Sequence, residues 1–106
     1  MPSLWEENDM DIKVNVDGQT ANVSLAGSLS AATAGELEEA LAPVLSGVRE
    51  VHFDFADLEY LSSAGLRVLM MTYKRLGGTG LSVDNACDEI REVFDITGFS
   101  ALFDIR

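Results

Sequence analysis

Two adjacent serines, Ser62 and Ser63, carry the clearest chemical signal in the sequence. They follow an apolar run at residues 51–55, which predicts a buried strand, and they open a segment at residues 63–76 with helical periodicity. The serines therefore stand in a strand-to-helix turn. A serine hydroxyl there can cap the helix by accepting a hydrogen bond from a free backbone N–H, and the same N–H groups favour a phosphate. The sequence leaves two roles open, a helix cap and a regulated hydroxyl.

Three further features could take part in chemistry, and each has a simpler structural explanation. His52 could join Ser63 and an aspartate in a hydrolase triad, but the turn lacks a G-x-S-x-G elbow and an evident oxyanion hole. Cys87 stands where a helix is expected to begin and fills a capping position there. The glycine run at residues 77–80 follows a helix and not a strand, unlike a dinucleotide-binding loop. A binding module fits these residues better than a catalyst, and no catalytic residue is expected.

The composition limits the partners and cofactors. The 106 residues include 7 Lys/Arg and 18 Asp/Glu, and the resulting net charge of −11 disfavours binding to nucleic acid or anionic membranes. It suits a partner with a basic surface. A single cysteine excludes an internal disulfide, no His/Cys cluster offers a zinc site, and no apolar run approaches the roughly 20 residues that span a bilayer. We expect a cytoplasmic protein without metal or cofactor.

Hydrophobic periodicity predicts the elements. Alternating residues on either side of Asp17-Gly18 predict a β-hairpin. Ser30 or Thr33 can cap the first helix, and Thr33 with Glu36 has the spacing of a capping box. The last helix is expected to direct Ile90, Val93, Phe94 and Ile96 toward the core. Further strands are expected at residues 50–55, 81–83 and 101–105, and further helices at residues 63–76 and 88–97.

The order β-β-α-β-α-β-α-β predicts an α/β fold. It implies a mixed sheet of four or five strands, mostly parallel, with one antiparallel strand from the hairpin. Right-handed crossovers place the helices mainly on one face. A chain of this length buries about two-thirds of its unfolded surface, enough for one domain without disulfides or metals. Residues 1–9, which include Trp5, form an acidic leader, and residues 10–106 form the domain.

Four segments match a known family. They are Gly27-Ser28-Leu29, the strand Phe53-Asp54-Phe55 with the turn at residues 58–66, the region of Lys74, and residues 93–99. Together they resemble the STAS domain, and more narrowly the bacterial anti-sigma factor antagonists. The Ser-Ser-Ala-Gly-Leu turn and the Phe-Asp-Ile-Thr-Gly-Phe helix end are the most specific segments, and the resemblance covers about residues 10–105.

The resemblance implies a partner switch. In such proteins the serine two residues before the motif glycine, here Ser63, is phosphorylated by a kinase that is also the anti-sigma factor. The unphosphorylated antagonist binds this kinase and frees the sigma factor, which regulates transcription, and a phosphatase resets the antagonist. The resemblance places partner binding at Ser28, Ser30, Ser62, Ser63, Ala64, Gly65, Leu66 and Arg67.

The chain departs from the family pattern at two places. Ser62 stands where the family often has an acidic residue, so Ser62 is the second candidate for phosphorylation. Gly27-Ser28-Leu29-Ser30 stands where the family often has Gly-Glu-Leu-Asp. Two other functions stay open. One is a STAS adaptor or scaffold for a signalling partner outside the sigma factor system, with or without phosphorylation, and the other is an enzyme.

Overall fold

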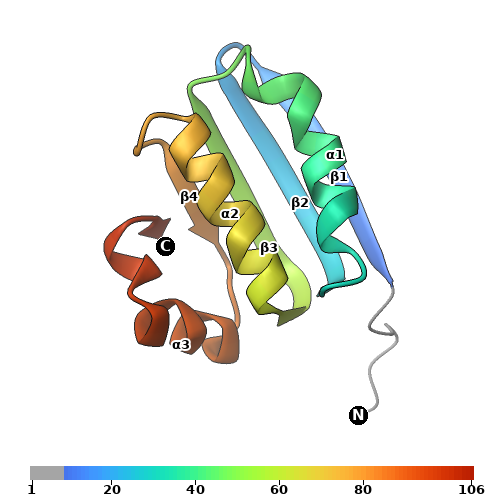
Figure 1. Cartoon of the computed structure of the whole chain (residues 1–106), viewed down its shortest axis with the longest axis vertical. Helices are drawn as coiled ribbons and strands as arrows, with labels where there is room; N and C mark the ends of the chain where they lie inside the picture. The colour runs from blue at the N-terminus through green and yellow to red at the C-terminus, as the bar shows by residue number, and fades with distance from the viewer. Residues whose placement is uncertain (1–8) are drawn as a thin grey trace.

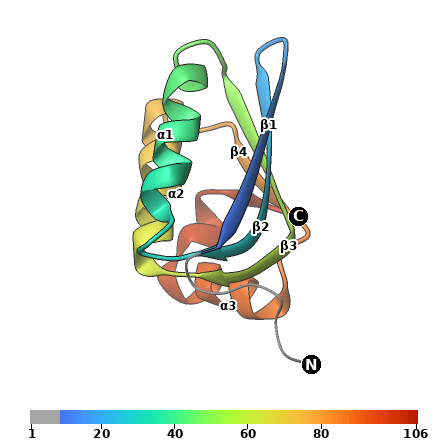
Figure 2. The ribbon, with the colours of Figure 1, turned by 90° about the vertical axis from the view of Figure 1, so that its right-hand side faces the viewer.

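In the described part of the chain, residues 9–106, five strands form one mixed sheet, and the three α-helices lie mainly on one of its faces (Figures 1 and 2). The computed structural model describes residues 9–106, so Trp5 and all of the predicted leader except Asp9 lie outside the described residues. In chain order the elements are β1 (Met10–Asp17), β2 (Thr20–Leu29), α1 (Ala34–Leu45), β3 (Glu50–Leu61), α2 (Ser63–Arg75), β4 (Leu81–Asp84), α3 (Asp88–Thr97), the 3₁₀ helix η1 (Phe99–Ala101) and β5 (Asp104–Ile105).

The sheet order is β1-β2-β3-β4-β5, with β1 antiparallel to β2 and all other neighbours parallel. The predicted α/β class, the element order and the one-sided arrangement of the helices are confirmed. Asp17 pairs with Thr20 across a two-residue turn, as the hairpin signal predicted. Gly18 in this turn has a φ of 63°, a left-handed conformation that glycine adopts without strain.

The core between the sheet and the helices is rich in phenylalanine. Phe53 and Phe55 from β3 and Phe94 from α3 are fully buried. The ring centroids of Phe53 and Phe55 are 5.8 Å apart, and those of Phe55 and Phe94 are 6.4 Å apart. Aromatic pairs at such separations stabilise a fold beyond the contribution of their buried area. Leu37 of α1 and Leu69 of α2 complete this core at 0% exposure, and thereby fix α2 against the sheet.

Two predicted strand boundaries are wrong. β3 continues to Leu61 instead of ending at Phe55, because two register shifts in its pairing with β2 allow the strand to bend and remain paired. The last strand contains only Asp104–Ile105. The residues before it do not belong to the strand. Gly98 leads the chain into η1, and Phe103 is buried in the core.

Helix α3 begins at Asp88 and ends at Thr97, as predicted. Gly98 terminates it in a left-handed conformation with a φ of 82°. Ile90 is buried, but Ile96, which was predicted to face the core, is 77% exposed. Ile96 follows Ile90 by six positions, which lies outside the i, i+3, i+4 pattern of a buried helical stripe.

The hydroxyl of Thr33 binds the preceding loop instead of forming the predicted capping box. Thr33 occupies the N-cap position of α1, but its side chain makes no capping hydrogen bond. Its Oγ1 donates to the carbonyl oxygen of Ser28 at 2.7 Å and accepts from the backbone N–H of Ser30 at 2.9 Å. The loop between β2 and α1 is therefore held closed on itself.

Candidate functional site

Ser62 caps helix α2 at the end of strand β3. Its backbone is extended, and its Oγ accepts a hydrogen bond from the backbone N–H of Gly65 at 3.1 Å. Its own backbone N–H donates to the carbonyl oxygen of Leu29 at 2.9 Å, which ties the turn to the end of β2. An extended residue whose side-chain oxygen binds the N–H three positions later is an N-cap. Of the two predicted roles, Ser62 takes that of the helix cap.

Ser63 is the first residue of α2, and it is exposed. Its hydroxyl makes no hydrogen bond with another described residue. The backbone N–H groups of Ser63 and Ala64 belong to the first helical turn, where N–H groups have no acceptor within the helix. The two serines are thus distinguished by the structure, since the fold uses the hydroxyl of Ser62 and leaves that of Ser63 accessible.

Gly65 allows α2 to begin directly against the end of β2. A Cβ atom at this position would lie 2.6 Å from Cγ of Leu29. Leu66 is also buried, so these two predicted partner-binding positions lie beneath the turn and fix its place. Of the other two predicted positions in α2, Ala64 is half-buried and Arg67 is exposed.

Ser28 and Ser30, which were predicted to contact a partner, are each only 6% exposed. The hydroxyl of Ser30 accepts a hydrogen bond from the backbone N–H of Ala32 at 3.2 Å. The backbone N–H of Ser28 donates to the carbonyl oxygen of Asp9 at 2.9 Å. The exposed side chains of this loop are those of Ala31 and Ala32, so a partner that approaches the loop meets these alanines first.

Tyr60 is an exposed aromatic residue near the turn that sequence reasoning missed. It lies in β3, two residues before Ser62, and is 48% exposed. Exposed tyrosines frequently anchor protein interfaces. Its position between the buried residues Leu58 and Leu61 was the available signal, but its orientation depends on the irregular pairing of β3 with β2.

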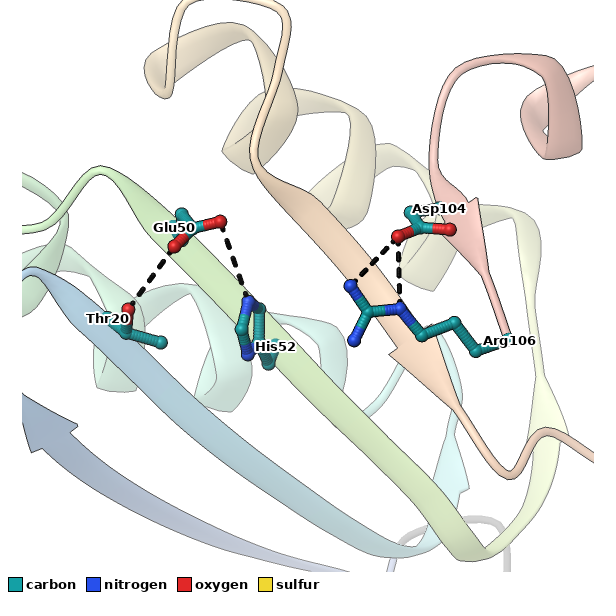
Figure 3. Close-up of polar contacts among 5 residues, drawn as sticks. All are labelled: Thr20, Glu50, His52, Asp104 and Arg106. Atoms are coloured by element: carbon teal, nitrogen blue, oxygen red, sulfur yellow. Dashed lines mark hydrogen bonds and ion pairs between the residues drawn. The ribbon is translucent and has the colours of Figure 1, made fainter.

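The hydrolase triad that the sequence left open is not assembled. His52 lies nine residues before Leu61 in β3, which places it roughly 30 Å along the strand from the serine turn. Figure 3 shows His52 beside Glu50, with its Nε2 atom 3.8 Å from Oε1 of that residue, and Thr20 donating to Oε2 of Glu50 at 3.5 Å. The imidazole therefore belongs to a polar group near the start of the strand, remote from Ser63.

The other residues that the sequence analysis considered form no second functional site within residues 9–106. Cys87 occupies the N-cap position of α3, as predicted, although its thiol makes no capping hydrogen bond. Within residues 9–106, no group of three or more His, Cys, Asp or Glu side chains is arranged to hold a metal ion. No helix in this described part combines the length and apolar character needed to cross a membrane. The turn at Ser62 and Ser63 is therefore the candidate site.

Comparison with known proteins agrees with the fold. A family model described as "Mlab, STAS domain" matches residues 12–104. BtrV of Bordetella bronchiseptica, by name an anti-sigma factor antagonist, is 39% identical over 84 residues, which are 76% of this chain and 72% of BtrV. The anti-sigma-B factor antagonist of Bacillus subtilis is 29% identical over 102 residues, which cover 94% of this chain and 85% of that protein.

A solved structure gives the same result. The crystal structure of an anti-sigma factor antagonist from Mycobacterium paratuberculosis matches with a TM-score of 0.86 and 28% identity, over 96% of this chain and 89% of that one. The family model covers most of the chain, and the Bacillus subtilis relative covers 94% of it. The chain belongs to the STAS domain family, among the anti-sigma factor antagonists.

Proposed function

We propose that this protein is an anti-sigma factor antagonist controlled by phosphorylation of Ser63. The unmodified protein binds an anti-sigma factor that is also a serine kinase, and this binding frees the sigma factor. Phosphorylation ends the binding, and a phosphatase restores it. One observation carries the proposal: the hydroxyl of Ser62 is bound to the N–H of Gly65 at 3.1 Å, whereas Ser63 is exposed.

Ser63 can accept a phosphate without disruption of the fold. A phosphate adds a charge of about −1.5 to −2 at neutral pH. At the first position of α2 this charge meets the positive end of the helix dipole and the free N–H groups of the first turn. An anion at an exposed helix start is stabilised by about 0.3–1 kcal/mol. The domain therefore stays folded when Ser63 is modified.

Ser62 is the poorer acceptor. A phosphate on its Oγ atom would disturb the hydrogen bond from Gly65, and the loss of an N-cap costs about 0.5–2 kcal/mol. The backbone of Ser62 is also bound to Leu29. A kinase would thus have to open the turn to reach this hydroxyl, while the neighbouring hydroxyl is already exposed.

The phosphate acts on the interface. A partner packed over the turn would contact exposed side chains around Ser63, among them Ala31, Tyr60 and Arg67. A charged phosphate beneath such a partner must lose its water, and the burial of a charge without a matching partner is strongly unfavourable. Binding is lost although the antagonist itself is unchanged in fold.

The protein is regulatory, acts in the cytoplasm, and catalyses no reaction of its own. The distance of roughly 30 Å along β3 between His52 and the turn supports this view, because the exposed Ser63 has no imidazole beside it to act as a general base. The net charge of −11 further disfavours direct binding to nucleic acid or to anionic membranes.

Phosphate mapping tests the proposal. The protein is incubated with ATP and each anti-sigma kinase of the source organism, and the modified residue is identified by mass spectrometry. We expect one phosphate on Ser63 in the wild type and in Ser62→Ala, and none in Ser63→Ala. A phosphate on Ser62 in the wild type would contradict the assignment. Phosphorylation of Ser63 by none of these kinases, but by another serine kinase of the organism, would identify an adaptor for another signalling partner.

A further inference from the structure

One side of helix α2 presents basic and methionine side chains on an otherwise acidic protein. Ser63, Arg67, Met70 and Lys74 follow the spacing i, i+4, i+7 and i+11, so they share one face, and Met71 lies beside them. Ser63, Arg67, Met71 and Lys74 are exposed, and Met70 is half-buried. These five residues, here called the α2 outer face, extend over about 16 Å of helix.

The charge of α2 differs from that of the rest of the chain. α2 contains Arg67, Lys74 and Arg75 and no acidic residue, whereas both α1 and α3 contain several acidic residues. The whole chain has 7 Lys/Arg and 18 Asp/Glu, which leaves 4 basic and 18 acidic residues outside α2. Net charge alone suggested a basic partner, but the charge next to the candidate site has the opposite sign.

The fold accounts for Lys74 but not for Arg67. Within the described part of the chain, Arg67 and Lys74 form no ion pair at 4 Å or less. Lys74 lies in the last turn of α2, where a cation favours the helix dipole, but Arg67 lies in the second turn and gains no such stabilisation. Met71 is 44% exposed, and exposed methionines are typical of adaptable binding surfaces.

We propose that the α2 outer face is the surface on which the anti-sigma factor docks, and that the covering surface of this partner is acidic around an apolar patch. The inference rests on the proposed function, because Ser63 forms one end of the face. Carboxylates of the partner pair with Arg67 and Lys74, and its apolar patch covers the two methionines. Charge complementarity of this kind selects partners and accelerates association.

Phosphorylation then removes the attraction between the two surfaces. Arg67 and Lys74 carry two positive charges, and a phosphate on Ser63 adds about −1.5 to −2. Arg67 follows Ser63 by four positions, the spacing at which opposite charges on a helix pair. The phosphate therefore brings the α2 outer face close to neutrality and pairs with Arg67, its nearest cation. An acidic partner then loses its ion pair with Arg67 and its attraction to Lys74.

Paired charge reversals test the inference. Arg67→Glu/Lys74→Glu reverses two charges on the α2 outer face, and Arg49→Glu/Arg91→Glu makes the same change in charge at exposed positions elsewhere. The Kd for the anti-sigma kinase, measured by calorimetry with ADP, should rise at least ~10-fold for the first pair and less than ~2-fold for the second. The affinity of the wild type should also fall as the salt concentration rises.

The outcomes separate this inference from the proposed function. Equal affinities for the two reversed pairs, with the wild type still bound, would overturn the docking surface and leave the proposed function intact. Tighter binding by Arg67→Glu/Lys74→Glu would overturn it as well, because the partner surface would then be basic. A wild type that binds none of the anti-sigma kinases would overturn both. Arg67→Gln/Lys74→Gln, which keeps good helix formers, should weaken binding in the same direction with an unchanged circular dichroism spectrum.

Discussion

The Oγ atom of Ser62 accepts a hydrogen bond from the backbone N–H of Gly65 at 3.1 Å. This contact assigns different tasks to two adjacent serines. Ser62 holds the start of α2, so the position of the helix does not depend on the exposed hydroxyl of Ser63. A phosphate can therefore be added at Ser63 while the turn that presents it stays in place.

The substitution Ser62→Ala should destabilise the domain by about 1 kcal/mol, because the N–H of Gly65 loses its acceptor. Ser63→Ala is the matched control and should change the free energy of unfolding by less than about 0.5 kcal/mol. Urea unfolding followed by circular dichroism measures both values. Equal values for the two variants would show that Ser62 is not the cap.

The substitution Gly65→Ala should destabilise the domain by about 1–3 kcal/mol, because the new Cβ would overlap Cγ of Leu29 at 2.6 Å. Gly35→Ala in α1 is the control. Nothing lies within 4 Å of a Cβ at that position, so alanine should not destabilise the domain.

A double variant identifies the cause of the loss at Gly65. In Gly65→Ala/Leu29→Ala the overlapping side chain is absent. The losses in unfolding free energy of the single variants Gly65→Ala and Leu29→Ala should therefore sum to more than the loss of the double variant. Additive losses would mean that the packing against Leu29 is not what requires glycine.

The substitution Thr33→Val should destabilise the loop between β2 and α1. The buried carbonyl of Ser28 and the N–H of Ser30 both lose the hydroxyl that now binds them, at a cost of about 1–3 kcal/mol. Thr33→Ser keeps the hydroxyl and should cost clearly less. If valine and serine gave the same unfolding free energy, these hydrogen bonds would contribute nothing measurable.

The order of elements was predictable because each long segment has one buried face. α3 carries both its apolar stripe and its terminating Gly98 within the local sequence. The continuation of β3 beyond Phe55 was not predictable, because it depends on register shifts in the pairing with β2. The shortness of β5 likewise depends on the burial of Phe103, which packs against Phe94 with ring centroids 6.0 Å apart.

At the candidate site, hydrophobic periodicity predicted the turn and two serine roles, and only the family resemblance assigned phosphorylation to Ser63, with Ser62 as second choice. A shift of one residue in the start of α2 would make Ser63 the cap, and periodicity does not define a helix end that closely. The burial of Ser28 and Ser30 depends on the folded loop around Thr33. A pattern of residue types does not predict the hydrogen bonds that close this loop.

The affinity of the anti-sigma kinase for the unmodified and the phosphorylated protein tests the central claim most directly. Phosphoserine is placed at Ser63 alone, and calorimetry in the presence of ADP measures the Kd of each form. The unmodified protein should bind at least ~100-fold more tightly than the phosphorylated one, and both forms should show the same circular dichroism spectrum. Equal affinities of the two folded forms would contradict the claim that Ser63 controls partner binding.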